Sequence, residues 1–122
     1  MTQITSTKQR PYDSEERTLQ FAKHVSQFIR GLPKNITNIE YAKQLARSAG
    51  SVGANYIEAN ECLGRKDFAM RVKIAKKEAK ESRYWLQLLE VSTPVDDKDR
   101  LNLIDEATQL MKIFGAVIER SN

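Results

Sequence analysis

Cysteine and histidine are almost absent from the sequence. Its 122 residues include one cysteine, Cys62, and one histidine, His24. A lone cysteine cannot form a disulfide within the chain, and zinc or di-iron sites need several ligands at fixed spacings, which this sequence lacks. We therefore expect no disulfide, no metal and no cofactor, and the reducing cytoplasm as the location.

Long apolar runs, proline and glycine are scarce as well. No run of about 18 apolar residues is present, so we expect no transmembrane helix. The segment before residue 18 has no apolar stretch of the kind that signal peptides contain, so we expect no signal peptide. The 3 prolines and 5 glycines favour long helices over many turns, and 40% hydrophobic with 30% charged residues fits one soluble globular domain.

Four segments carry apolar residues at the spacing of amphipathic helices, and none alternates as a strand does. The predicted helices are 14–32, a second from just after Asn35 or Thr37 to about 63, 66–92, and a fourth that ends at about 120. Gly64 is expected to cap the end of the second helix, and Asp96 and Asp97 the start of the fourth. Short connections predict an all-α, antiparallel up-down four-helix bundle over 13–122, preceded by a flexible N-terminal arm over 1–12.

The third predicted helix has the most regular core pattern, in which steps of four and three residues alternate as in left-handed bundles. Its seam is Phe68, Val72, Ala75, Ala79, Ser82, Leu86 and Leu89. The second helix has a line of smaller residues: Ala42, Leu45, Ala49, Val52 and Tyr56. The stripe expected on the fourth is Leu101, Ile104, Ala107, Met111, Phe114 and Ile118, broadened by Leu103, Leu110 and Val117.

Positive charge is concentrated on the third predicted helix. From Arg65 to Trp85 there are eight basic and three acidic residues, an excess of five positive charges, whereas the whole chain carries +4. On a helical wheel most of the cations gather on one flank of the seam. One interpretation is a solvated face with pairs such as Lys77–Glu81; the other is contact with phosphates.

The phosphate interpretation predicts sequence-independent binding to a nucleic-acid backbone. Aromatic residues are not interleaved with the cations apart from Tyr84, which argues against the stacking of single-stranded bases. The predicted nucleic-acid-binding residues are Arg65, Lys66, Lys73, Lys76, Lys77, Lys80 and Arg83.

The opposite flank of the same helix is apolar, although acidic residues are mixed into it. Its apolar residues are Met70, Ile74, Trp85 and Leu88. This flank either packs against a neighbouring helix of the same bundle or is buried in another subunit. On the second alternative these four residues form an oligomer interface.

Asn55 and Glu58 are spaced to lie on one face of the second predicted helix. We expect a buried polar pair that fixes helix register, with Arg71 or Arg83 as a partner. A catalytic carboxylate would need a second acid, a histidine or a nucleophile beside it, and the sequence places none there. We therefore expect that the protein is not an enzyme.

Three motifs in the middle of the chain resemble a known family. They are SVGANYIEA at 51–59, RKDF at 65–68, and the Ile74-Ala75 step followed by Glu81. The segment 50–89, which contains these motifs, resembles the bacterial four helix bundle protein family. That family includes proteins encoded in intervening sequences of large-subunit ribosomal RNA genes. Outside this segment, the likeness is one of helix lengths and order.

The resemblance implies an up-down four-helix bundle that is often assembled as a ring-like homopentamer. It also implies kinship with the accessory proteins of diversity-generating retroelements, which are basic bundles that bind nucleic acid and a reverse transcriptase. Because a net charge of +4 is low for that group, general association with RNA is the preferred function. The alternative is a protein–protein scaffold or adaptor, including an accessory subunit of a reverse transcriptase.

Overall fold

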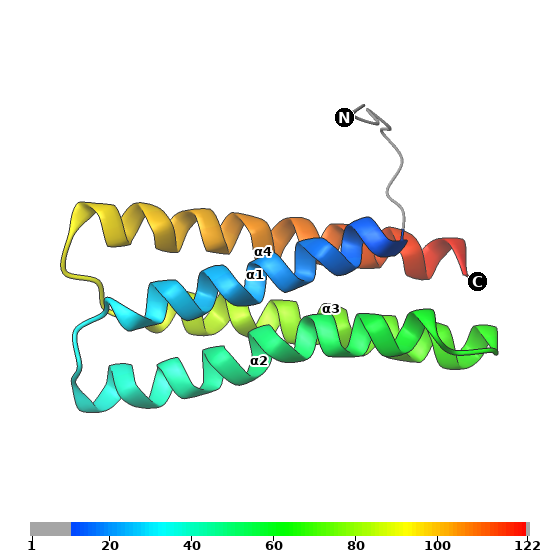
Figure 1. Cartoon of the computed structure of the whole chain (residues 1–122), viewed down its shortest axis with the longest axis horizontal. Helices are drawn as coiled ribbons and strands as arrows, with labels where there is room; N and C mark the ends of the chain where they lie inside the picture. Colours follow the sequence, from blue (N-terminus) through cyan, green and yellow to red (C-terminus); the bar gives the residue numbers. More distant parts are fainter. Residues whose placement is uncertain (1–10, 122) are drawn as a thin grey trace.

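The computed structural model describes residues 11–121, and these form four helices joined by short connections (Figure 1). The helices are α1 (Pro11–Arg30), α2 (Ile36–Asn60), α3 (Arg65–Leu88) and α4 (Pro94–Arg120). The all-α prediction is confirmed. Residues 1–10 of the predicted arm lie outside the described part of the chain.

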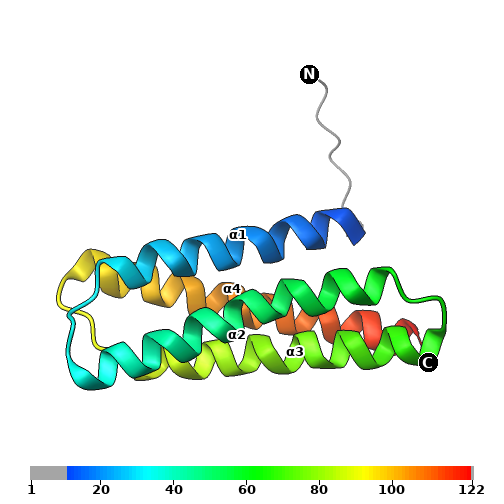
Figure 2. The ribbon, with the colours of Figure 1, turned by 60° about the horizontal axis from the view of Figure 1, so that its bottom comes forward.

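Consecutive helices run antiparallel, so α1 begins and α4 ends at the same end of the molecule (Figures 1 and 2). Each helix packs against two neighbours: α1 and α3 both contact α2 and α4. This arrangement is the predicted up-down four-helix bundle.

Several predicted helix ends are wrong by a few residues. Helix α1 begins at Pro11, because the fixed φ of proline suits the first helical position and its missing N–H is not needed there. Helix α3 ends at Leu88, before the predicted residue 92. Asn35 caps α2 as expected, and its side chain accepts a hydrogen bond from the backbone N–H of Asn38 at 2.9 Å.

The predicted roles of Gly64, Asp96 and Asp97 are corrected. Gly64 precedes α3 in an extended conformation with φ of −95°, so it is the N-cap of α3, not the left-handed end of α2. Thr93 caps α4 by accepting a hydrogen bond from the N–H of Asp96 at 3.0 Å. The two aspartates therefore lie in the first turn of α4, where their charge suits the helix dipole.

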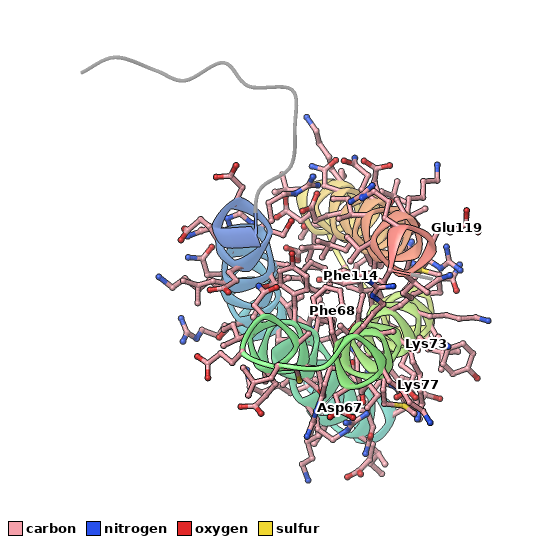
Figure 3. All side chains as sticks on the ribbon, turned by 90° about the vertical axis from the view of Figure 1, so that its right-hand side faces the viewer. Asp67, Phe68, Lys73, Lys77, Phe114 and Glu119 are labelled. Atoms are coloured by element: carbon pink, nitrogen blue, oxygen red, sulfur yellow. The ribbon has the colours of Figure 1, made fainter. Side chains whose placement is uncertain are left out.

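The core is built from the predicted seams of α2 and α3. All members of the α3 seam are buried except Phe68, which is partly buried and points inward beside Phe114 (Figure 3). On α4 the predicted stripe is shifted around the helix, because Leu101 is 53% exposed while Leu103 and Leu110 are buried. The observed α4 seam is Leu103, Ala107, Leu110 and Phe114.

Small residues set the distances between α2 and its neighbours. The hydroxyl oxygens of Ser48 and Ser82, both fully buried, lie 2.8 Å apart and join α2 to α3. On the other side of α2, a Cβ atom at Gly53 would lie 2.8 Å from Oγ1 of Thr18 on α1. Gly53 is therefore needed for the close approach of α1, not for a special backbone conformation.

Replacing Gly53 by alanine tests this close approach. Gly53→Ala should lower the free energy of unfolding by up to about 2 kcal/mol, because overpacking costs about 1–3 kcal/mol and alanine recovers only about 1 kcal/mol of helix propensity. Gly50→Ala is the matched control: nothing lies within 4 Å of a Cβ there, so stability should rise by about 0.5–1 kcal/mol. Urea denaturation followed by circular dichroism at one protein concentration measures both, and equal shifts would contradict the packing argument.

Candidate nucleic-acid interface

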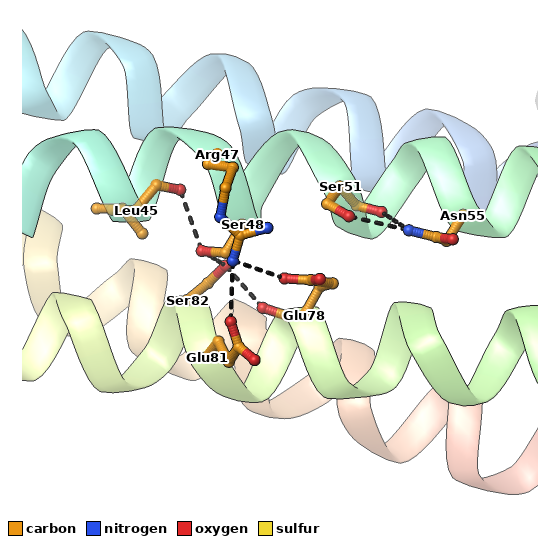
Figure 4. A network of polar contacts seen from close by, with 8 residues as sticks. All are labelled: Leu45, Arg47, Ser48, Ser51, Asn55, Glu78, Glu81 and Ser82. Atoms are coloured by element: carbon orange, nitrogen blue, oxygen red, sulfur yellow. Dashed lines mark hydrogen bonds and ion pairs between the residues drawn. The ribbon is translucent and has the colours of Figure 1, made fainter.

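Helix α3 lies between α2 and α4, so its charged residues are divided between two sides of the seam. On the α2 side, the guanidinium of Arg47 contacts carboxylate oxygens of Glu78 at 3.3 Å and Glu81 at 3.0 Å (Figure 4). Glu78 is buried, with 8% of its surface exposed. Two of the three acidic residues of α3 are thus held at the contact with α2.

The predicted nucleic-acid-binding residues lie on the other side of α3, toward α4 and solvent. Lys73 and Lys77 point outward from the bundle, away from Phe68 and Phe114 at its centre (Figure 3). Five of the seven are exposed, and Lys76 and Arg83 are partly buried. Within the part of the chain that the structure describes, none of the seven forms an ion pair. We call this set of seven residues the basic surface.

The Lys77–Glu81 pair, which would have neutralised part of this surface, is not formed among the described side chains. Glu81 faces Arg47 of α2 instead. The positive charge of α3 is therefore not compensated by its own acidic residues.

A groove of about 490 Å³ runs between α3 and α4 beside the basic surface. Its lining residues are Lys76, Arg83, Thr108, Met111, Lys112, Gly115, Ala116 and Glu119. Arg83 Nη1 donates a hydrogen bond to Thr108 Oγ1 at 3.2 Å, and that hydroxyl in turn donates to the carbonyl of Ile104 at 2.9 Å. The guanidinium of Arg83 is thereby held at the groove.

Lys112 was missed by the sequence reasoning, which considered α3 alone. A signal was present: Thr108, Lys112 and Gly115 follow each other at helical spacing, next to the α4 seam. Only the packing of α4 against α3 shows that this line faces the cations of α3. A second groove of about 490 Å³ lies at the start of α3, lined in part by Arg65, Lys66 and Lys73.

The four residues predicted for an oligomer interface are divided. Trp85 is partly buried and stacks on Tyr41 of α2, with ring centroids 6.0 Å apart, so it contributes to the packing of its own bundle. Ile74 is also partly buried. Met70 and Leu88 remain exposed, at 57% and 37%.

The predicted buried pair on α2 is corrected for Glu58, whose side chain is exposed. Asn55 is partly buried: its Nδ2 donates to the carbonyl and the hydroxyl of Ser51, both at 2.9 Å (Figure 4). Arg71, one of the two expected partners, donates to Asn55 Oδ1 at 3.3 Å. Asn55 thus joins α2 to α3, whereas Glu58 lies on the side of α2 that faces solvent.

Among residues 11–121, no three histidine, cysteine, aspartate or glutamate side chains are grouped so that they could hold a metal ion. None of the helices in this range is long and apolar enough to cross a membrane.

Comparison with known proteins places the chain in a family. A crystal structure of a protein with unknown function from the S23 ribosomal protein family of Bacteroides thetaiotaomicron is similar, with a TM-score of 0.78 and 29% sequence identity. The similarity covers 89% of this chain and 97% of that chain. No curated protein sequence matches. The model of the family described as 23S rRNA-intervening sequence protein matches residues 12–116, and the chain therefore belongs to this family.

Proposed function

We propose that the protein is a non-enzymatic, oligomeric bundle that associates with RNA through the basic surface of α3. The observation that carries this proposal is the separation of charge across α3. Arg47 holds Glu78 and Glu81 on the α2 side, which leaves seven cations without an ion pair among the described residues. Such a surface suits several phosphates of a nucleic-acid backbone, and binding of this kind is salt-dependent and independent of sequence.

The family supports RNA as the nucleic acid. Its description refers to an intervening sequence of 23S rRNA, and the similar crystal structure is assigned to a ribosomal protein family. A protein acting on such RNA would work in the cytoplasm, where ribosomal RNA is found.

Self-association is the second part of the proposal. Met70, near the start of α3, and Leu88, at its end, are exposed apolar side chains, and with the family resemblance they support contact with a second copy of the chain. A ring, with the pentamer implied by the resemblance, would repeat the basic surface once per subunit. Weak contacts at each surface then add to a useful affinity for one RNA molecule.

The same exposed residues support the alternative function, a scaffold or adaptor for another protein such as a reverse transcriptase. The two functions differ in what covers Met70 and Leu88. The mass of the purified protein by light scattering, together with its absorbance ratio for bound nucleic acid, distinguishes them.

Charge reversal tests the RNA-binding surface. The triple variant Lys73→Glu, Lys76→Glu and Lys80→Glu should strongly weaken the binding of a structured RNA at low salt and leave the oligomer intact. For each phosphate that the variant no longer binds, the slope of log affinity against log salt should also fall by about 0.7–0.9. Fluorescence anisotropy over a salt series measures both.

The control for this variant makes the same change of charge elsewhere. Lys23, Lys34 and Lys98 are exposed and lie outside α3, so their reversal to glutamate should weaken binding much less. Equal RNA affinity in the wild type and the α3 variant would refute the proposal and favour the adaptor.

Substitution of exposed apolar residues tests the assembly. Met70→Glu with Leu88→Glu should lower the mass measured by light scattering while the helical content remains unchanged, because charged residues are disfavoured in the core of an interface. RNA affinity should also fall, because multivalency is reduced and because the new carboxylate at residue 70 lies beside Arg65, Lys66 and Lys73. Leu101→Glu is the control, since Leu101 is similarly exposed, at 53%, but lies on α4. An unchanged mass in the double variant would show that this side of α3 is not the interface.

A further inference from the structure

We infer that the groove between α3 and α4 is a phosphate-binding site for the RNA backbone, and that Lys112 of α4 is one of its binding residues. The inference rests on the proposed association with RNA and adds a second helix to it. The basic surface then continues from α3 into a groove that α4 completes.

Three cations from two helices converge on this groove. Lys76 and Arg83 come from α3 and Lys112 from α4, and all three line the same volume of about 490 Å³. Lys76 and Arg83 are partly buried, so water screens their charge less than it would on an open helix face. Glu119 is the one carboxylate among the lining residues, which leaves an excess of two positive charges.

Convergence of like charges is unfavourable unless an anion lies between them. The short hydrogen-bonded chain from Arg83 through Thr108 to Ile104 nevertheless holds one of these cations at the groove. The guanidinium keeps further N–H donors for a ligand, and such a planar group can bind two phosphate oxygens at once. Lysine ammonium groups on both sides of the groove can donate to the same two non-bridging oxygens of a phosphodiester, because each of these oxygens accepts more than one hydrogen bond.

The ammonium of Lys76 packs over Gly115. A Cβ atom at residue 115 would lie 3.5 Å from Nζ of Lys76, which is ordinary contact. A long side chain at residue 115 would therefore displace this ammonium from the groove without changing the net charge. The groove opens to solvent and its volume of about 490 Å³ leaves room for a hydrated phosphate.

The surroundings of the groove favour an RNA backbone as its ligand over a single free anion. Exposed Lys73 and Lys80 belong to the same side of α3 as Lys76, beyond the lining of the groove. A chain of phosphates can contact the groove and these lysines together, whereas a single anion can contact the groove alone.

Neutralising Lys112 is the direct test, and Lys98→Gln on the same helix is its control. Lys112→Gln should weaken binding of a structured RNA about fivefold at low salt, the effect of removing one close charge pair. It should also reduce the salt slope by about 0.7–0.9. Lys98→Gln should change neither quantity, because Lys98 does not line the groove.

Removing the carboxylate of Glu119 should act in the opposite direction, so Glu119→Gln should bind RNA more tightly than the wild type.

Substitutions at Gly115 leave the charge unchanged, so they separate the effect of the groove's shape on binding from the effect of its electrostatic potential. Gly115→Leu should lower RNA affinity, because the leucine side chain displaces the Lys76 ammonium from the groove, whereas Gly115→Ala should change the affinity little, because its Cβ atom makes only an ordinary contact with Lys76. Both changes raise helix propensity, and thermal melting checks that the fold is kept. If Gly115→Leu does not fold, the exposed positions Lys112 and Glu119 still provide the test.

The outcomes distinguish this inference from the proposed function. If the wild type does not bind RNA at low salt, both are refuted. If the wild type binds and the variants at Lys112, Gly115 and Glu119 bind equally well, the groove is refuted while the basic surface of α3 stands. If polyglutamate binds the wild type more tightly than the RNA does at the same salt and the same concentration of charge, and Lys112→Gln weakens the binding of polyglutamate but not that of RNA, the groove is a site for acidic peptides and the RNA assignment is wrong.

Discussion

The contact of Arg47 with Glu78 and Glu81 determines where the charge of the molecule lies. One guanidinium on α2 faces two carboxylates on α3, so two of the three acidic residues of α3 are turned toward α2 and away from its lysines. Glu81 would otherwise be spaced to pair with Lys77, one turn earlier on the same helix. The same packing of α3 between α2 and α4 presents its cations to α4 and to solvent. The proposed interaction with RNA therefore depends on a contact made on the opposite side of the helix.

Sequence periodicity predicts the buried side of this bundle well because burial acts on every residue of a seam. The strict four-and-three spacing of α3 can be satisfied only if Val72, Ala79 and Leu86 face the same way, and all three are fully buried. The apolar pattern predicts the buried face of a helix less well where apolar residues cover a broader part of its circumference. On α4, Leu101 and Leu103 are both plausible core residues, and only the packing against the other helices buries Leu103 and leaves Leu101 exposed.

Features that depend on a neighbouring helix could not be predicted from the sequence. Gly64 follows one helix and precedes another, and glycine suits either end, so composition does not assign it to α3. Glu58 has the spacing of a buried partner for Asn55, but the direction of its side chain depends on how α2 is rotated against α3. Lys112 and Gly115 can be recognised as part of a phosphate site only when α4 is known to lie beside Lys76 and Arg83.

A single groove is expected to bind RNA weakly, so useful affinity requires that several subunits assemble. Three cations and one carboxylate can hold only one or two phosphates, and each such contact is weak at physiological salt. A long RNA contacts several grooves at once only if the subunits are held together. Once the RNA is bound at one groove, its effective concentration at the next groove is high, so the overall affinity rises without additional contacts at the first groove. Met70 and Leu88 lie on α3, the helix that also carries the cations, so the surface proposed for assembly and the surface proposed for RNA share one rigid element. Assembly through α3 would therefore fix the spacing of successive grooves along the bound strand.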